Sequence, residues 1–324
     1  MASVPSNLYD SYEDVGIKED FSDFVYNISP VETPLLSAIA QTRASNRVHY
    51  WQTDALPTVD GTTGVTAEGL DPDLTAKAAP NLRGNYSQIN AVAFGVSGSD
   101  EIFEKYGRAG SLAYQSAIFA RWLKRQVEMG ISGINQAAVI GDGTGTARKS
   151  ASLSAWLTTN VSRGALGSNP TLSGGIPNAG ATDGTQRAIS TTLVNDVMTL
   201  AFNSGGKPNL FLMGPAQRTA FSALDGIAAR RVDASERRIY GVADMYMSNF
   251  GELVIVPTRH IRQTSSRDRE AYVIDPDLVA FAVARPWQQF DLAKTGDSYR
   301  REMLVEWTLE MRNEAGHAVV ADLT

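Results

Sequence analysis

The chain has 324 residues, 43% of them hydrophobic, which is enough to bury a sizeable core in one large domain or two modest ones. Its net charge of −6 and isoelectric point near 5.2 argue against a protein that coats nucleic acid, because such coating needs many Lys and Arg side chains to neutralise phosphates. The sequence contains no cysteine, which excludes disulfides, thiolate metal sites and cysteine nucleophiles.

The N-terminal segment predicts an arm that does not fold alone. Residues 1–20 carry few aliphatic and many acidic side chains, with neither the basic start nor the apolar run of a secretion signal. No stretch of the sequence reaches the ~18 apolar residues that cross a bilayer, so we expect a soluble protein made inside the cell, with no membrane partner. Phe21 and Phe24 then form an apolar ridge, and Pro30 and Pro34 divide the chain into short pieces that dock separately.

Residues 48–96 predict an extended two-stranded excursion. Two aromatic and β-branched runs, VHYWQT and NYSQINAVAFGV, flank a long connection rich in Gly, Pro and Thr. Arms of about fifteen residues would project roughly 50 Å at ~3.3 Å per residue. Since an isolated two-stranded ribbon is marginal in water, we expect this one to lie on another surface.

Residues 111–135 predict a long amphipathic helix of roughly 35 Å, at ~1.5 Å per residue. Its apolar stripe, with members three or four residues apart, consists of Phe119, Leu123, Val127, Ile131 and Ile134, widened by Ile118, Trp122 and Met129. The opposite arc carries Arg121, Lys124, Arg125 and Glu128. We expect this arc to stay in water, where Lys124 and Glu128, one turn apart, can pair.

The second half of the chain predicts a mixed α/β region followed by a return strand. Residues 157–190, rich in Gly, Ser, Thr and Asn, indicate a loop or weak hairpin, and residues 191–286 alternate helix and strand signals. Within that region, two strands are hinged at residues 275–277. Residues 302–311 alternate apolar and mainly acidic side chains, which predicts a strand with one wet face and one face packed on the long helix.

Motifs for catalysis are weak. GDGTG at residues 141–145 has neither the third glycine nor a Lys-Ser/Thr pair at the spacing that a phosphate-binding loop requires, so we interpret it as a turn. GVSGS around Ser97 has serine where a nucleophile elbow requires glycine. His49, His260 and His317 lie in three different regions without partners at ligand spacing, so we expect neither a metal nor a cofactor.

Two arginine-rich stretches leave three interpretations open: solvated faces, salt-bridged subunit contacts or nucleic-acid contacts. The first contains Arg230, Arg231, Arg237 and Arg238, and the second contains Arg259, Arg262, Arg267 and Arg269. Acidic residues are interleaved with both.

The order of an acidic arm, an extended ribbon, a long helix, a mixed α/β region and a return strand resembles the major capsid proteins of tailed bacteriophages with the Hong Kong 97 fold. The terminal segments DFSDFVYNISPVETPLLSAI and AKTGDSYRREMLVEWTLEMRNEAGHAVVADL look like the branch of that family typified by the podovirus SU-ten. The resemblance implies an α+β fold with these parts: N-terminal arm 1–47, E-loop 48–98, peripheral domain with spine helix 99–150, Gly/Ser-rich loop or insertion 151–190, axial domain 191–286 and return strand into the peripheral domain 287–324.

The same resemblance implies a subunit that is not an enzyme and that self-assembles through hexamers and pentamers into an icosahedral head enclosing double-stranded DNA, without sequence-specific DNA contacts. It implies a separate scaffolding protein, a portal protein at one vertex, assembly in the host cytoplasm and residence in the virion. The alternatives are an encapsulin-like compartment and a small α/β hydrolase or nucleotide-binding enzyme.

Aromatic and arginine side chains of the arm, the ribbon and the first arginine-rich stretch are the expected subunit contacts, because such residues dominate interface energies. The candidates are Phe21, Phe24, Tyr50, Trp51, Tyr86, Arg230, Arg231, Arg237 and Arg238. For the aromatics, packing within the subunit is the alternative.

Overall fold

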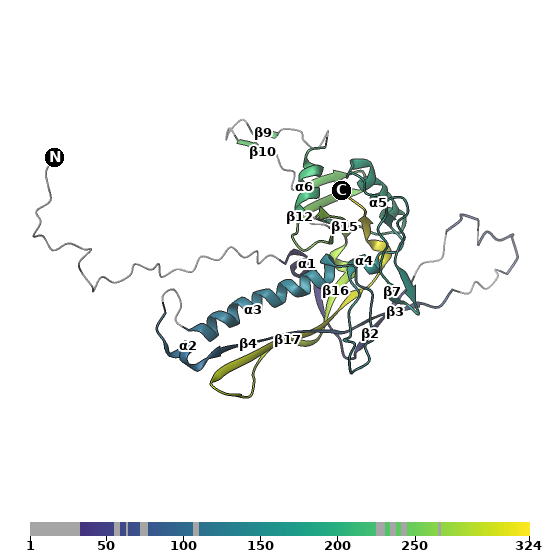
Figure 1. The fold of residues 1–324 in the computed structure, drawn as a ribbon. Helices are drawn as coiled ribbons and strands as arrows, with labels where there is room; N and C mark the ends of the chain where they lie inside the picture. Colours follow the sequence, from purple (N-terminus) through teal and green to yellow (C-terminus); the bar gives the residue numbers. More distant parts are fainter. Residues whose placement is uncertain are drawn as a thin grey trace, which may run out of the picture.

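Two β-sheets organise the chain in a computed structural model (Figure 1). The structure describes residues 33–54, 59–62, 64–71, 77–105, 110–224, 231–233, 238–240, 245–264 and 267–324. Within these ranges, no helix combines the length and the apolar composition that a membrane span needs.

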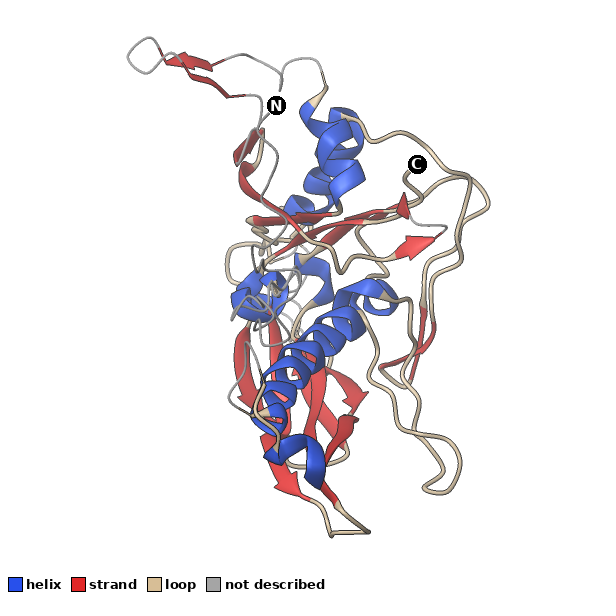
Figure 2. Cartoon of the chain, turned by 60° about the vertical axis from the view of Figure 1, so that its left-hand side comes forward, coloured by secondary structure: helices blue, strands red, loops and turns tan. Residues whose placement is uncertain are grey.

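The first sheet has four strands in the order β1-β16-β17-β4. These strands are β1 (Ala40–Arg43), β16 (Val279–Asp291), β17 (Ser298–Met311) and β4 (Gln88–Ser97). Strand β1 runs parallel to β16, whereas β16, β17 and β4 are antiparallel neighbours. The long helix α3 (Ser111–Glu128) covers one face of this sheet, as Figure 2 shows. The helix-on-sheet layer predicted from the sequence is confirmed.

Helix α3 continues into a π-helical turn at Met129–Gly133, so the predicted single α-helix is helical over most of its length but changes geometry at Met129. Leu123, Val127 and Ile131 are fully or almost fully buried, as their spacing predicted. A Cβ at Gly130 would lie 3.3 Å from the ring of Trp307, so the close approach of this turn to β17 favours glycine.

Strand β17 confirms the predicted period of two but not the predicted wet face. Its apolar side chains, among them Val305, Trp307 and Leu309, lie in the core that contains Leu123 and Val127. On the opposite face Thr308 and Glu310 are also buried. That face is covered because the base of the ribbon and the loop at residues 148–151 pack on it through hydrogen bonds such as Ser87 Oγ to Glu306.

Glu128 corrects the prediction of a fully solvated arc on the long helix. Its carboxylate is buried and accepts hydrogen bonds from the backbone N–H groups of Leu35 (2.9 Å) and Leu36 (2.8 Å). These N–H groups open helix α1 (Pro34–Ala38), whose N-cap residue Thr33 makes no side-chain cap. Burial raises the pKa of Glu128, and the two backbone hydrogen bonds oppose that rise. Glu128 therefore fixes α1 to the end of α3.

Replacing Glu128 by glutamine is expected to lower the free energy of unfolding by about 1–3 kcal/mol, because one of the two buried N–H groups then faces an amide NH₂ and loses its acceptor. Chemical denaturation at neutral pH measures this difference. The matched control is Glu104→Gln on the exposed surface, for which a change within about 0.5 kcal/mol is expected. Equal stability of the two variants would contradict the capping role.

The second sheet has six strands in the order β11-β12-β8-β15-β18-β5. They are β11 (Met245–Ser248), β12 (Gly251–Pro257), β8 (Leu210–Met213), β15 (Ala271–Ile274), β18 (Ala318–Val320) and β5 (Val161–Ser162). Helices α5 (Thr191–Asn203) and α6 (Pro215–Ser222) pack on one face with Phe211 and Val273, while Leu212 and Tyr272 on the other face join the core of the first sheet. The two sheets therefore share one continuous body.

The six-stranded sheet and its helices are mixed α/β, but they draw on more of the chain than residues 191–286. Strands β5 and β18 come from residues before and after that range. The predicted hinge is a 3₁₀ turn at Pro276–Leu278, and it sends β15 and β16 into different sheets. The chain then runs through β16 and β17 in the four-stranded sheet and returns to the six-stranded sheet with β18.

Residues 151–190 contain more ordered structure than a loop. The short helix α4 (Leu153–Trp156) is fully buried, and β6 (Thr171–Ser173) pairs with β7 (Ile176–Ala179) as the expected weak hairpin. An ionic network ties this segment to Glu270, directly before β15: Arg262 contacts Glu270 at 2.8 Å and the exposed Asp183 at 2.6 Å, and Ser154 donates to Glu270 at 2.9 Å. Arg262 therefore pairs inside the subunit.

The ribbon consists of β2 (Val48–Thr53) paired with β3 (Asn81–Tyr86). The predicted arms of about fifteen residues are wrong, because the following strand β4 leaves the ribbon and pairs with β17. Every described residue between β2 and β3 is exposed, including Val59 (95%), Val65 (82%) and Leu70 (66%).

The remaining short elements are α2 (Gly98–Ile102), the hairpins β9 (Arg231–Asp233) with β10 (Arg238–Tyr240) and β13 (Gln263–Thr264) with β14 (Arg267–Asp268), and a 3₁₀ turn at Glu314–Gly316.

Candidate subunit interfaces

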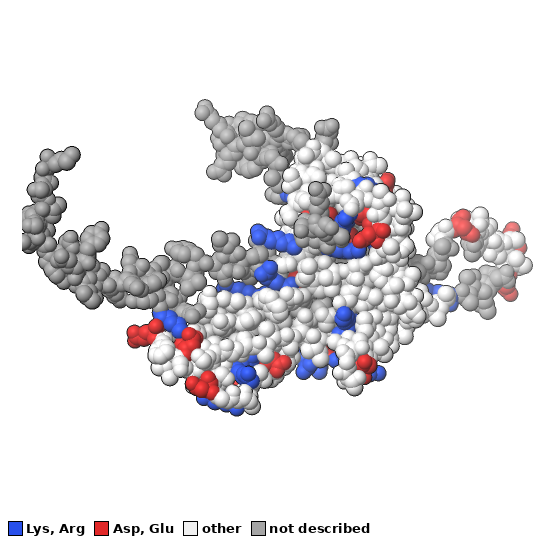
Figure 3. Space-filling view, in the orientation of Figure 1, with Lys and Arg blue, Asp and Glu red and all other residues white. Residues whose placement is uncertain are grey.

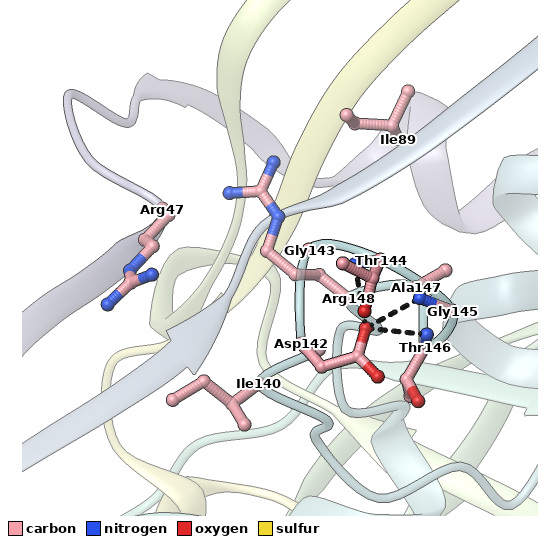
Figure 4. Close-up of a pocket in the computed structure, with 11 residues that line it drawn as sticks. Arg47, Ile89, Ile140, Asp142, Gly143, Thr144, Gly145, Thr146, Ala147 and Arg148 are labelled. Atoms are coloured by element: carbon pink, nitrogen blue, oxygen red, sulfur yellow. Dashed lines mark hydrogen bonds between the residues drawn. The ribbon is translucent and has the colours of Figure 1, made fainter.

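The GDGTG segment is a self-satisfied turn beside a cavity of about 620 Å³ (Figure 4). One carboxylate oxygen of Asp142 accepts hydrogen bonds from the N–H groups of Thr144, Gly145 and Thr146 at 2.8–2.9 Å. These bonds hold the pKa of Asp142 well below its usual range. Because the turn's own carboxylate occupies the N–H groups that a phosphate would need, the predicted turn is confirmed.

The other motifs of the sequence also have structural roles. The Ser97 hydroxyl caps α2 by accepting from the N–H of Asp100 at 3.2 Å, so GVSGS is a helix start. His317 is buried and accepts a hydrogen bond from the N–H of Asp275, and burial lowers its pKa to about 4. No group of three or more His, Asp or Glu side chains within the described ranges could hold a metal ion.

The ribbon residues singled out from the sequence point in two directions. Trp51 faces the body, where its ring lies 5.3 Å from that of Trp156. Tyr50 faces outward and is 51% exposed, with its ring flat against Gly84, where a Cβ would lie 2.6 Å from it. Successive strand residues point to opposite faces, so one of the pair can pack inward while the other is available to a neighbour. Tyr86 is half-buried at the end of β3.

The remaining candidates have no described side chains. Phe21, Phe24, Arg230 and Arg237 lie outside the described residues, whereas Arg231 and Arg238 lie in the paired strands β9 and β10.

Glu310 joins the base of the ribbon to both β1 and β17. Its carboxylate accepts from Thr42 Oγ1 at 2.8 Å and from Arg312 Nε at 3.2 Å, and it contacts His49 Nε2 at 3.2 Å. The hydrogen bond to His49, followed by those to Thr42 and Arg312, lowers the pKa of Glu310 to about 2, against the opposing effect of burial. The contacts of Glu310 with Thr42 and His49 could not be predicted from the sequence pattern, because these partners lie 268 and 261 residues away in the chain.

Glu310→Gln is expected to cost about 2–3 kcal/mol of stability at pH 7 and little at pH 2.5. The folded-state pKa of about 2 lies below the ordinary glutamate pKa of 4.5, so the stabilisation is complete above pH 4.5 and is lost as the pH falls through this window. Denaturant unfolding at several pH values measures the difference from wild type. A difference that is independent of pH would refute the assignment, and Glu252→Gln on the exposed surface of β12 is the control.

Strand β4 forms an unusually long open edge of the four-stranded sheet. Its sequence, QINAVAFGVS, has no charged residue and no proline, the features with which proteins usually protect an edge. Gly98 donates its N–H to Asp297 O, and bonded positions alternate in antiparallel pairs, so the even-numbered residues of β4 bond to β17. The backbone groups of residues 89, 91, 93 and 95 therefore point away from the sheet, where the described part of the chain offers no further strand.

The flank of α3 above this edge carries apolar and amide side chains beside Arg125. Phe94 of β4 stacks on Phe119 of α3 at 4.9 Å, and Phe119 meets Trp122 edge-on at 6.5 Å. Trp122 is 40% exposed and shares its flank with Gln115, Ile118 and Gln126, at spacings of three and four residues. The β4 edge and this flank together form what we call the edge groove.

Two further exposed apolar patches were not found from the sequence. Met245 (53%), Met247 (69%) and Val254 (46%) lie on the open end of the six-stranded sheet. Trp287, Phe290, Leu292 and Tyr299 are exposed around the tip of the β16–β17 hairpin. Single exposed apolar residues are ordinary, but several groups on one subunit are typical of a protein that binds other copies.

A family model for the SU10 major capsid protein matches residues 5–324. The chain belongs to the SU10 major capsid protein family. It is accordingly a structural protein of a tailed-phage virion that self-associates in the capsid, and it is not an enzyme.

Sequence and structural relatives agree with this family assignment. The major capsid protein of Escherichia phage Phieco32 is 30% identical over 121 residues, which cover 37% of this chain and 34% of that relative, so the match spans about a third of its length. A solved chain of Mycobacterium phage Adephagia has a TM-score of 0.61 at 15% identity, with 98% of this chain and 99% of that chain covered. A chain from the capsid of a native GTA particle gives 0.62 at 10% identity, with 97% and 98% covered. At these identities the structural matches show the fold, which is the Hong Kong 97-like α+β fold expected from the resemblance.

Proposed function

We propose that this subunit of the SU10 major capsid protein family assembles through hexamers and pentamers into the icosahedral head that encloses the phage's double-stranded DNA. The observation that carries the proposal is the edge groove. An edge of ten residues without charge or proline is a template for another chain, so a soluble monomer that left it open would aggregate. In a closed shell each copy covers the edge of the next, because head-to-tail contacts that close into rings leave no free edge.

In this arrangement the four-stranded sheet with α3 is the peripheral domain and the six-stranded sheet is the axial domain around capsomer symmetry axes. The ribbon with its exposed Val59, Val65 and Leu70 is the E-loop, and residues 1–47 are the N-terminal arm. Assembly takes place in the host cytoplasm on a separate scaffolding protein, with a portal protein at one vertex. Our candidates for subunit contacts remain Phe21, Phe24, Tyr50, Tyr86 and the first arginine-rich stretch.

Electron microscopy and sedimentation of the purified full-length protein test the assembly. Shells or ring-shaped capsomers are the expected result, and a discrete dimer or tetramer would overturn the proposal. Double-stranded DNA that is protected from nuclease inside particles from infected cells is expected as well. Particles that instead enclose a cargo enzyme and no DNA would favour the encapsulin-like alternative.

A further inference from the structure

The N-terminal segment accounts for the net negative charge of this protein. Residues 1–32 contain seven acidic side chains and one lysine, a net charge of −6, which equals the net charge of the whole chain. The acidic positions are Asp10, Glu13, Asp14, Glu19, Asp20, Asp23 and Glu32. The rest of the chain is therefore balanced, and an unpaired group of cations within it is a site where this segment can bind.

Such a group lies where α3 passes beneath the six-stranded sheet, and we call it the basic notch. It consists of Arg121, Lys124 and Arg125 on α3 and Arg259 after β12. Arg121, Lys124 and Arg259 are exposed, Arg125 is half-buried with a buried Nε that lacks a partner, and none of the four forms an ion pair with a described residue. Figure 3 shows Lys and Arg side chains gathered at this border.

A hydrogen bond joins the two parts of the notch, the end of α3 and the segment after β12. Ser132, in the π-helical turn after α3, donates to the backbone oxygen of His260, which fixes the segment that carries Arg259 against the end of α3. Burial lowers the pKa of His260, and the charges of Arg125 and Arg259 lower it further, so both cations lie close to this one imidazole.

The described chain begins beside this notch. Glu128, one turn beyond Lys124, binds the N–H groups of Leu35 and Leu36, so the first described residues lie at the end of α3. The helix from residue 121 to residue 128 is only about 10 Å long, whereas ten extended residues reach about 33 Å. A segment tethered this closely has a high local concentration at the notch, which favours docking within one chain over docking from another.

We propose that residues 10–23 dock in the basic notch of their own chain and so lay the N-terminal arm along α3. Individual exposed ion pairs contribute only about 0.2–1 kcal/mol each, but several acidic side chains face four cations here. The contact is screened by salt, since the Debye length falls to about 3 Å at 1 M ionic strength. This inference goes beyond the proposed function and does not rest on it.

Cysteine pairs in the full-length protein provide the test, because the natural chain contains no cysteine and the introduced thiols are the only ones. One chain carries Lys124→Cys with Glu13→Cys, Glu19→Cys or Asp20→Cys, and mild oxidation is followed on a non-reducing gel. At least one pair is expected to form an intrachain disulfide in high yield at low salt and several-fold less at 1 M salt. In the matched control, Gln126→Cys takes the place of Lys124→Cys. Gln126 is exposed on the other flank of α3, so the control should give an intrachain disulfide yield about fivefold lower.

Charge reversal in the notch sharpens the test. Arg121→Glu with Arg259→Glu is expected to lower the disulfide yield about tenfold, and adding Asp10→Lys, Asp14→Lys and Asp23→Lys should restore it. Equal yields with Gln126→Cys would overturn the proposal. Disulfide-linked dimers would place the arm on a second copy and also overturn it. The proposal would also be overturned if the Arg121→Glu and Arg259→Glu variant kept its disulfide yield but lost bound DNA, because the notch would then be a nucleic-acid surface. Particle formation, scored separately by electron microscopy, reports on the proposed function alone.

Discussion

Proline in place of Ala93 is expected to stop capsid assembly while leaving the subunit folded. Ala93 is exposed in the middle of β4, and its N–H points away from β17, so proline removes no hydrogen bond within the sheet. The folded subunit should lose no more than about 1 kcal/mol. A strand of a neighbouring copy that pairs with this edge would lose one backbone hydrogen bond, worth about 0.5–1.5 kcal/mol, and would also clash with the proline ring. Together these effects are expected to lower the affinity of each such contact more than tenfold.

Sedimentation measures the assembled fraction, and circular dichroism with thermal melting measures the fold. Ala93→Ser is the matched control, because it keeps the N–H and should assemble as wild type does. Trp122→Ala, on the α3 flank of the edge groove, is expected to weaken assembly in the same direction. Normal particles from Ala93→Pro would show that no strand pairs with β4.

Trp307→Ala is expected to have the largest effect on stability, a loss of about 3–5 kcal/mol. Trp307 is fully buried between the two layers, where its ring centroid lies 5.5 Å from that of Phe281 and its Nε1 donates to Asn90 at 2.9 Å. Alanine would leave a cavity beneath Gly130 and would remove one of the two donors to the Asn90 oxygen, leaving only Gln88 Nε2.

Chemical denaturation of the unassembled subunit measures this loss, and Trp307→Phe should recover part of it. Trp287→Ala, at a position that is 37% exposed near the tip of the β16–β17 hairpin, is the control and should cost less than about 1 kcal/mol. A small effect at Trp307 together with a large one at Trp287 would contradict the position of the core.

Periodic patterns predicted the long helix and the long strand well, because the apolar stripe of a helix and the alternation of a strand depend only on residues close together in the sequence. The spacing of Leu123, Val127 and Ile131 located α3, and the alternation around Trp307 located β17 and their shared core. The Hong Kong 97-like fold followed from the order of such elements and from the terminal segments.

Contacts between distant segments were not predictable in this way. Glu128 looked like a surface partner for Lys124, but α1 lies more than ninety residues earlier in the chain and buries it. Strand β4 was assigned to the ribbon because NYSQINAVAFGV reads as one run, although the chain changes sheets at Ser87. The absence of charge and proline in β4 was visible in the sequence and is the signal that could have identified the edge groove.

A cryo-EM reconstruction of particles formed by the full-length protein would show what covers the edge groove. We expect an icosahedral shell in which a backbone segment of a neighbouring copy pairs with the outward N–H groups of β4 and packs against Trp122. A shell in which the β4 edge faces solvent, or a discrete small oligomer in place of a shell, would contradict it.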